Sequence, residues 1–346
     1  MTDAVVFRNV SIIFGDNPHK ALSMVDAGKS RDEIGAQTGL VLGVADATLS
    51  INEGEILVLM GLSGSGKSTL LRAVNGLAPV VRGEVEVKAG SDSVNPYKAT
   101  PKALRDFRMH TVSMVFQQFA LLPWRTVADN VGFGLELAGV PEAERKARVA
   151  EQLELVNLAK WAGRKVNELS GGMQQRVGLA RAFATGAPIL LMDEPFSALD
   201  PLIRTRLQDE LLEFQRRLKK TIIFVSHDLD EAFRIGNRIA IMEGGRIIQC
   251  GTPQEIVKNP ANQYVADFVQ NMNPINMLTA EDVMQQGAAG GNGVTATARP
   301  ETPLVDILDA MARTPGNVGV VDNGTVVGTI NAQDIVNGLT RHRRRG

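Results

Sequence analysis

The sequence contains little cysteine, few aromatic residues, no long apolar run and no excess of one charge. Its single cysteine among 346 residues, Cys250, excludes an intrachain disulfide and gives no sign of a metal cluster. Aromatic residues make up 5%, and the formal net charge is -1, so neither a base-stacking surface nor a general attraction to nucleic acid is expected. No apolar run reaches the roughly 18 residues of a membrane span, and "MTDAVVFRNV" lacks the pattern of a secretory signal. We therefore expect a cytosolic protein that binds no nucleic acid and reaches a membrane only through a partner.

Short apolar runs that end in polar residues recur along the chain and predict an α/β fold with a parallel sheet. These runs are "EILVLMG", "VSMVFQ", "APILLMDEP" and "TIIFVSHD". Continuous apolar runs are typical of parallel strands that are covered on both faces. Ligands of such sheets bind beyond the carboxyl ends of the strands, so the polar residues that end these runs are candidates for a functional site.

One of these strands is followed by "GLSGSGKS", which fits the pattern G-x-x-x-x-G-K-[ST] and precedes a helical segment, "TLLRAVNG". In such a loop, successive backbone N–H groups surround a phosphate, and glycines permit positive φ angles. Lys67 would reach the β- and γ-phosphate oxygens of ATP, and the Ser68 hydroxyl would bind Mg²⁺. An ordinary glycine-rich turn is the alternative, but the strand before the loop and the helix after it argue against it. The predicted phosphate-binding residues are Gly61, Leu62, Ser63, Gly64, Ser65, Gly66, Lys67, Ser68 and Thr69.

Three further strand ends carry residues suited to ATP hydrolysis. Asp193 would hold Mg²⁺, and the adjacent Glu194 would act as general base toward the attacking water. Gln117 could contact the metal and the water, and His227 could bind the γ-phosphate. Taken alone, each residue has a structural alternative: the acids can cap the next helix, and a lone histidine or glutamine after a strand is commonly structural.

A second predicted anion site lies far from the first, in "LSGGMQQRVGLARA". Ser170, Gly171 and Gly172 precede a helical pattern, and the free N–H groups at a helix start favour an anion. A helix cap with nothing bound is the alternative reading. One nucleotide is not easily held by both elements of one chain, whereas a dimer resolves the difficulty. Each phosphate loop would hold one ATP, and Ser170–Gly172 of the partner chain would close over its γ-phosphate.

The motifs "GLSGSGKST", "FQQFALLP", "LSGGMQQR", "LLMDEP", "SALD" and "VSHD" resemble, in order and spacing, those of ABC-transporter ATPase subunits over about residues 1–277. The resemblance implies a P-loop ATPase core with a parallel sheet, an N-terminal antiparallel β subdomain and a helical subdomain at about 116–183. It also implies a head-to-tail dimer that encloses two ATP molecules with Mg²⁺. Phe14 stands where the family has an aromatic ring on adenine, although a core position is equally consistent. The resemblance assigns Gln117 to the Q-loop, Ser170–Gly172 and Gln174 to the signature acting on the partner's nucleotide, Asp200 to the D-loop and His227 to the switch histidine.

The segment "FGDNPHKALSMVDAGKSRDEIGAQTGLVLGV" resembles an insertion found in ATPases of the glycine betaine/proline/choline importers. It predicts two short helices, with a Ser30–Glu33 capping box and a stop at Gly39. "LDPLIRTRLQDELL" and "NPANQYVADFV" resemble the same group, and "FALLPWRTV" and "MNPINMLTA" resemble its choline members. The resemblance implies import of choline or a related quaternary amine. It also implies membrane permease subunits, a separate substrate-binding protein and a location at the cytoplasmic face of the inner membrane.

The C-terminal part predicts a linker at 284–297, because "QQGAAGGNGVTATA" is small and glycine-rich. Residues 298–340 resemble a single CBS motif, a small α+β unit with a tight turn at Asn323–Gly324. Related ATPases usually carry two such motifs, so this one either pairs with its twin across a dimer or is a remnant. Two other functions remain open: an ABC ATPase of a different importer or of a process without transport, and a regulatory protein that senses a nucleotide through this tail.

Overall fold

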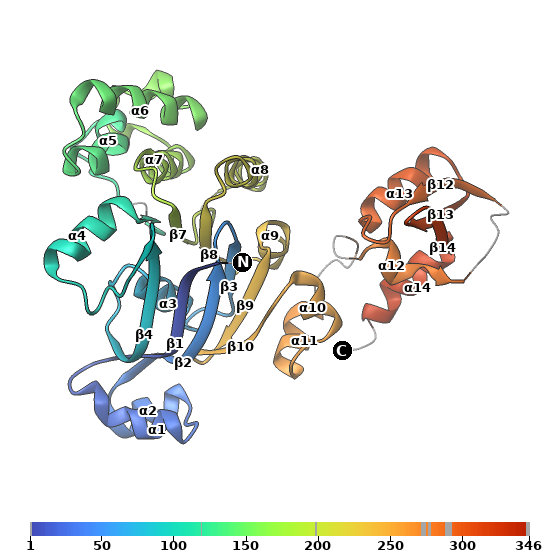
Figure 1. Ribbon diagram of the computed structural model, residues 1–346, viewed down its shortest axis with the longest axis horizontal. Coiled ribbons are helices and arrows are strands. Elements are labelled where there is room, and N and C mark those ends of the chain that lie inside the picture. The colour runs from blue at the N-terminus through green and yellow to red at the C-terminus, as the bar shows by residue number, and fades with distance from the viewer. Residues whose placement is uncertain are drawn as a thin grey trace. The chain divides into compact units, whose positions relative to one another are not determined.

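The structure, a computed structural model, describes residues 2–118, 120–197, 199–270, 275, 278–287 and 293–343. The chain divides into two compact units, Met1–Cys250 and Gly251–Gly346 (Figure 1). Within the described residues, no helix combines the length and the apolar character needed to cross a bilayer.

The centre of the first unit is a six-stranded sheet with the order β10-β9-β3-β8-β7-β6. The pairs β3–β8, β3–β9, β7–β8 and β6–β7 are all parallel. Every residue of β3, β7 and β8 is buried, as the continuous apolar runs predict. The strands are β3 (Ile56–Met60), β6 (Val112–Val115), β7 (Ile189–Asp193), β8 (Thr221–Val225), β9 (Arg238–Glu243) and β10 (Arg246–Gly251).

A second sheet, antiparallel and with the order β2-β1-β4-β5, packs against the first. Phe7 of this sheet shares one buried core with Leu57 and Leu191 of the parallel sheet and with Leu70 of α3 (Lys67–Ala73). The helix that follows the phosphate loop is therefore fixed by the main core. The strands of the second sheet are β1 (Asp3–Phe14), β2 (Val41–Asn52), β4 (Val80–Ala89) and β5 (Asp92–Val94).

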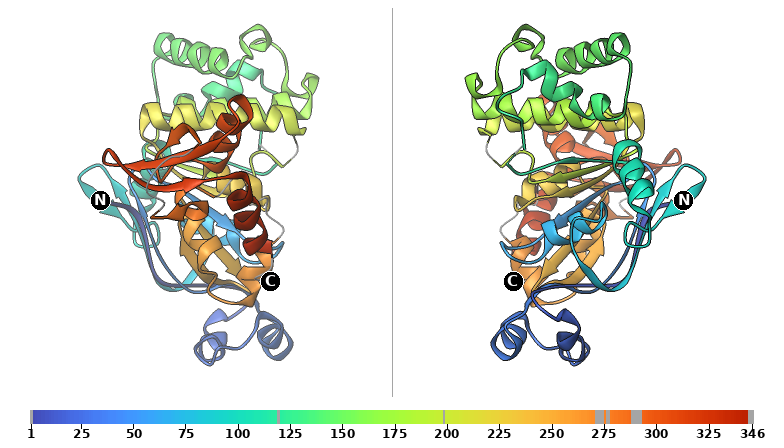
Figure 2. Two further views of the ribbon diagram at one scale, coloured as in Figure 1. Left: turned by 90° about the vertical axis from the view of Figure 1, so that its right-hand side faces the viewer. Right: turned by 90° about the vertical axis from the view of Figure 1, so that its left-hand side faces the viewer.

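A helical segment with its own core forms one end of the first unit, as the predicted helical subdomain requires (Figures 1 and 2). Val131, Leu153 and Val177 are buried together in that core, each from a different helix. These helices are α5 (Val127–Leu137), α6 (Glu142–Leu155) and α7 (Gly171–Ala184). The other helices of the unit after α3 are α4 (Pro101–His110), α8 (Pro201–Leu218) and α9 (Leu229–Ile235), with 3-10 turns η2 (Ala159–Trp161) and η3 (Val166–Glu168).

The insertion between β1 and β2 forms the opposite end of the first unit (Figure 2). It contains η1 (Pro18–Ala21), α1 (Leu22–Asp26) and α2 (Arg31–Thr38). The expected capping box between Ser30 and Glu33 is present, and Gly39 ends α2 with a φ of 71°. The insertion packs on β1 and β2 in a small separate core made of Ile13, Ala21, Val25, Ile34, Leu40, Leu42 and Ala45.

The second unit has a four-stranded sheet with the order β11-β14-β13-β12 and a separate core that includes Leu278, Ile307 and Val320. The predicted turn is present, with φ angles of 48° at Asn323 and 81° at Gly324. The strands are β11 (Gln285–Gln286), β12 (Val294–Ala298), β13 (Asn317–Asp322) and β14 (Thr325–Ile330). The helices are α10 (Pro253–Lys258), α11 (Gln263–Gln270), α12 (Ala280–Val283), α13 (Leu304–Arg313) and α14 (Ala332–Arg343).

The structure differs from the expected linker at 284–297. β11 and most of β12 fall inside this range, and β12 pairs in parallel with β13. "VTATA" therefore forms an edge strand, and its β-branched residues Val294, Thr295 and Thr297 favour that conformation despite the glycines before them. Residues 288–292 lie outside the described part, as do 276–277 at the end of the expected ATPase stretch. The second unit begins at Gly251, earlier than the boundary expected from the motifs.

Candidate nucleotide-binding site

The phosphate loop joins β3 to α3 and needs glycine at two positions. Gly61 has a φ of +142°, and a Cβ there would lie 2.1 Å from the Met242 carbonyl oxygen. Gly66 has a φ of +103°, and its Cβ would lie 2.4 Å from the Gly43 carbonyl oxygen. No other residue could adopt these angles at such close approach to neighbouring backbone. The loop is thus set tightly between β9 on one side and β2 on the other.

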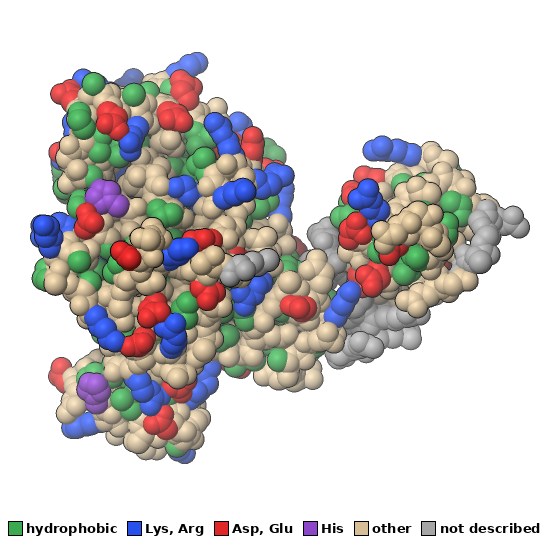
Figure 3. Space-filling model, viewed as in Figure 1, with side chains coloured by type: hydrophobic (Ala, Val, Ile, Leu, Met, Phe, Trp, Pro, Cys, Tyr) green, Lys and Arg blue, Asp and Glu red, His purple; other side chains and the backbone are tan. Residues whose placement is uncertain are grey.

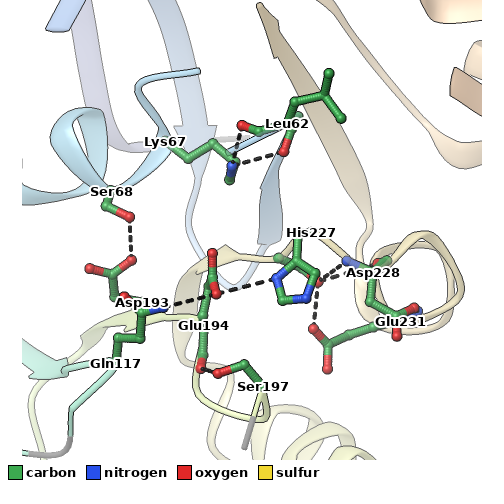
Figure 4. A network of polar contacts seen from close by, with 12 residues as sticks. Leu62, Lys67, Ser68, Gln117, Asp193, Glu194, Ser197, His227, Asp228 and Glu231 are labelled. Carbon is green, nitrogen blue, oxygen red and sulfur yellow. Dashed lines mark hydrogen bonds and ion pairs between the residues drawn. The ribbon is translucent and has the colours of Figure 1, made fainter. Parts of the chain in front are cut away.

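Lys67 is buried beneath the loop and points back to it (Figure 4). Its Nζ donates hydrogen bonds to the carbonyl oxygens of Gly61 at 2.8 Å and Leu62 at 2.9 Å. Burial lowers the pKa of this ammonium group, while the carboxylates of Glu194 and Asp193 oppose that shift. The charge is held by neutral carbonyl groups, which phosphate oxygens would replace with stronger, charge-assisted bonds.

Ser68 and Asp193, both predicted to hold Mg²⁺, are in direct contact: the Ser68 hydroxyl donates to Asp193 Oδ1 at 2.6 Å. Asp193 ends β7 and is fully buried. Its other oxygen, Oδ2, accepts from Arg72 at 2.9 Å. The sequence analysis missed Arg72, although its position four residues after Ser68 on one helix places both side chains on the same face.

Gln117 and His227 both contact one carboxylate oxygen of Glu194, although the three residues follow three different strands (Figure 4). Glu194 Oε2 accepts from Gln117 Nε2 at 3.1 Å and lies 3.2 Å from His227 Nδ1. Glu194 has a φ of 47°, in the left-handed region. Its N–H donates to the Val225 carbonyl at 3.2 Å, which ties the turn to the end of β8. The arrangement suits a carboxylate that must be aimed at a water molecule beside the bound nucleotide.

A polar network that the sequence analysis missed lies behind His227. Asp228 pairs with Arg204 on α8, with 2.9 Å between Oδ2 and Nη1, and its Oδ1 accepts from the Glu231 N–H at 3.1 Å. The Glu231 carboxyl is buried between the Ser226 hydroxyl at 2.5 Å and Gln208 Nε2 at 3.0 Å. Burial raises the pKa of Glu231 despite those hydrogen bonds. The residues on both sides of His227 are therefore anchored to α8 and α9.

The predicted signature and D-loop residues lie at the starts of α7 and α8, where their side chains make local hydrogen bonds. Ser170 Oγ accepts from the Met173 N–H at 3.4 Å and caps α7, while Gln174 Nε2 donates to the Leu169 carbonyl at 3.1 Å. Asp200 caps α8 in the same way, accepting from Ile203 at 3.1 Å. Ser170, Gly171 and Asp200 are exposed and Gly172 is half-buried. Among the described residues, Ser170, Gln174 and Asp200 make no hydrogen bond to Gln117, Glu194 or His227.

Phe14, at the end of β1, is 38% exposed and lies outside the main core. A Cβ on Gly43 would lie 2.8 Å from Phe14 Cε2 and 3.0 Å from Thr69 Cγ2. The ring therefore covers Gly43 next to the first turn of α3. This position is consistent with an aromatic ring that stacks on the base of a nucleotide held by the phosphate loop.

Comparison with known proteins identifies the family of the chain. Residues 44–197 match the family model "ABC transporter". The glycine betaine/proline betaine transport ATP-binding protein ProV of Salmonella typhimurium is 50% identical over 283 residues, which cover 82% of this chain and 70% of the relative. ProV of Escherichia coli is 45% identical over 337 residues, or 97% of this chain and 82% of the relative. The chain belongs to the ATP-binding proteins of ABC transporters.

Two solved structures support the same conclusion. The dimeric ABC transporter cassette MJ0796 matches with a TM-score of 0.61 and 30% identity, over 72% of this chain and 98% of that one. A second structure of that cassette, described as a post-hydrolysis state with ADP and Pi, matches equally well. The predictions of an ABC-type ATPase and of its fold are confirmed by the family, the two sheets and the helical segment.

On the face shown in Figure 3, acidic and basic side chains are interspersed over the first unit.

Proposed function

We propose that the chain is the ATP-hydrolysing subunit of an importer for glycine betaine, choline or a related methylated amine. The observation that carries this proposal is the similarity to ProV of Escherichia coli along 97% of the chain, including the insertion and the second unit. A trimethylamine N-oxide transport ATP-binding protein, TmoW of Ruegeria pomeroyi, is also 44% identical over 94% of both chains. The compounds named for these relatives share a fully substituted, methylated nitrogen, and choline carries the trimethylammonium group of glycine betaine.

In the proposed reaction, ATP lies on the phosphate loop with its base against Phe14. Glu194 accepts the proton of the attacking water, and Gln117 and His227 hold the carboxylate in place through the contacts at 3.1 and 3.2 Å. His227 is well exposed, with 59% of its side-chain surface accessible, so it can also reach the γ-phosphate. Lys67 exchanges its carbonyl partners for phosphate oxygens as the nucleotide binds.

The residues around Asp193 fit the magnesium ion that such a site is expected to use. Ser68, Gln117 and Asp193 offer hydroxyl, amide and carboxylate oxygens, which are the hard ligands that Mg²⁺ prefers. When bound, the metal would neutralise charge that develops on the β- and γ-phosphates. The Ser68 hydroxyl and the Asp193 carboxylate already lie 2.6 Å apart, so they can serve one ion through direct and water-mediated contacts.

The exposed signature residues support a head-to-tail dimer of this chain. Ser170–Gly172, with Gln174 and Asp200, would close over the nucleotide of the partner chain. The segment Leu121–Val127 would contact the permease, and Trp124 within it is 69% exposed. The chain would thus lie at the cytoplasmic face of the inner membrane, attached through permease subunits that receive substrate from a binding protein.

The second unit is proposed to be an accessory regulator built on the single CBS-like module at 298–340. Its core includes Leu278, Ala280 and Val283, which precede that module. A deletion that begins at 284 would therefore cut through the core, and a deletion that begins at Leu278 would remove it whole. An active ATPase with altered regulation would support the accessory role, whereas loss of ATP binding would favour the sensor as the principal function.

The experiment that tests the proposed function is ATPase activity of the chain reconstituted with its permease and binding protein. Glycine betaine, choline, proline betaine and trimethylamine N-oxide are compared at low and high salt, with Glu194→Gln as the inactive control. Stimulation by one of these compounds confirms the substrate class, and stimulation that rises with salt assigns a regulatory role to the second unit. ATPase activity that none of the compounds stimulates would overturn the substrate class while leaving the ATPase intact.

A further inference from the structure

The insertion between β1 and β2 reaches the phosphate loop through the side chain of Arg31. Arg31 is the first residue of α2, and its Nη1 donates a hydrogen bond to the Gly64 carbonyl in the middle of the loop. Its Nη2 donates to the Gly43 carbonyl at 3.1 Å. Gly43 is the residue that Phe14 covers, so one guanidinium joins the loop to the backbone beneath the proposed base-stacking ring.

The insertion is fixed firmly enough to hold this contact. The insertion shares an apolar core with β1 and β2. It is also tied to the main body by Arg82, which contacts Asp26 of α1 at 2.6 Å and also Asp46 of β2. Arg246 donates to the Val25 carbonyl at 3.0 Å. The capping box at Ser30 sets the direction of the first turn of α2. These contacts join the elements around Arg31 to β2, β4 and β10 of the main body.

Arg31 binds a carbonyl group of the loop to which Lys67 does not donate, although Lys67 Nζ also lies 3.5 Å from Ser65 Oγ. Lys67 binds the carbonyl groups of Gly61 and Leu62, whereas Arg31 binds that of Gly64, where φ is +81°. A peptide unit is planar, so fixing the Gly64 carbonyl also fixes the Ser65 N–H on its other side. That N–H donates to the Leu62 carbonyl at 3.1 Å in this structure. The two basic residues together set the curvature of the loop.

The guanidinium also carries a positive charge that no carboxylate in the described ranges pairs with directly. Its two Nη atoms donate to backbone carbonyl groups, and its buried Nε has no hydrogen-bond partner among the described residues. Partial burial removes much of the water that would otherwise screen the charge. The charge therefore remains effective beside a loop whose ligand is a polyphosphate.

We propose that Arg31 is a positioning residue for ATP, through which the insertion holds the phosphate loop in its nucleotide-binding shape. The inference rests on ATP binding at this loop and is independent of which compound is transported. A preorganised loop lowers the cost of ordering on binding, so loss of Arg31 weakens affinity without touching the groups that act on bound ATP. The insertion is then a part of the nucleotide site.

The test is the affinity for ATP and the ATPase kinetics of full-length Arg31→Ala. We expect the Kd and KM for ATP to rise about tenfold, the effect of one lost charge-assisted hydrogen bond, while kcat stays within about twofold. Arg31→Lys offers one ammonium group in place of the two donating nitrogens of the guanidinium, so it should restore part of the affinity for ATP. Lys29→Ala, which removes a charge that pairs with Glu33 at 2.7 Å on the surface, is the matched control.

Arg82→Ala separates positioning from stability, because it loosens the insertion at Asp26 without contacting the loop. This variant should have a lower thermal midpoint of unfolding, whereas its Kd for ATP should change little. If Arg31→Ala binds ATP as the wild type does, the inference is overturned. If Lys29→Ala weakens ATP binding as much as Arg31→Ala, the effect is general and the inference also fails. A wild-type chain that binds no ATP would instead refute the proposed function.

Discussion

Arg204 and Asp228 form an ion pair, 2.9 Å between Nη1 and Oδ2, that links the first turn of α8 to the residue after His227. Arg204 also donates to the Leu199 carbonyl at 3.3 Å, directly before the helix cap at Asp200. One guanidinium therefore contacts both the exposed segment that would face a partner chain and the loop that carries the histidine. We therefore expect a change in either segment to affect the other through this side chain.

We predict that Arg204→Ala lowers kcat by on the order of tenfold to a hundredfold, because a misplaced His227 no longer aligns Glu194. ATP affinity should be nearly unchanged, since the phosphate loop is not involved. Steady-state kinetics with nucleotide titration measure both. Arg206→Ala, which breaks a surface ion pair with Glu210 at 3.0 Å on the same helix, is the control. An unchanged kcat in Arg204→Ala would remove the pair from any role in the site.

Glu194→Gln should abolish turnover, with a loss on the order of 10²–10⁴-fold, because an amide cannot accept the proton of water. The substitution is isosteric, so ATP binding should persist and an ATP-bound dimer should accumulate. Size-exclusion chromatography with ATP, alongside an ATPase assay, tests both statements. Glu243→Gln, at an exposed strand end, serves as control. Normal turnover in Glu194→Gln would show that another group is the base.

Ser170→Arg should stop ATP hydrolysis in the dimer while leaving ATP binding by the isolated monomer intact. The new side chain occupies the exposed helix start that would meet the partner's γ-phosphate, whereas the phosphate loop of the same chain is untouched. Loss of the cap costs about 1 kcal/mol of stability. Asn167→Arg places the same charge on the exposed turn just before it. Equal loss of monomer binding in Ser170→Arg would contradict action on the partner's nucleotide.

Glu231 predicts a pH dependence of stability. Burial raises the pKa of its carboxyl in the folded protein, so the folded state holds the proton more tightly than the unfolded state. This preference favours folding below the ordinary value of 4.5 and is lost as pH rises through the raised pKa. Glu231→Gln, which remains uncharged, should therefore be more stable than the wild type near pH 8 and similar to it near pH 4.5.

Urea unfolding midpoints between pH 4.5 and 8 measure this difference, with Glu213→Gln on the exposed face of α8 as the control. Glu231→Leu should be less stable than Glu231→Gln by about 1–3 kcal/mol, because the Ser226 and Gln208 groups lose their buried partner. A stability difference between Glu231→Gln and the wild type that does not change with pH would refute the assignment.

Much of the site could be predicted because it depends on local sequence. The glycines of the phosphate loop, the strand ends at Gln117 and Asp193, and the capping box at Ser30 each combine a residue type with a nearby element, and the structure has all of them in those places. The turn at Asn323–Gly324 followed the same logic.

What could not be predicted depends on contacts between distant segments. Arg31 meets Gly64 only because the insertion folds back over β2, and no local pattern distinguishes it from the exposed arginines of other helices. Arg204 reaches Asp228 from another helix. The segment of β12 is predicted as a linker because of its glycine-rich neighbours, although three of its five residues, Val294, Thr295 and Thr297, are β-branched and favour a strand, and its pairing with β13 is a contact between separate segments.

The φ of 47° at Glu194 has a consequence for anyone who improves this protein by random variation. A glutamate held in the left-handed region costs on the order of 1–3 kcal/mol, which glycine or asparagine would recover. Selection for heat resistance alone would therefore enrich replacements at this position, and the selected variants would be more stable but without ATPase activity. A library screened for durability needs a concurrent turnover assay, because here the two properties are opposed by the backbone itself.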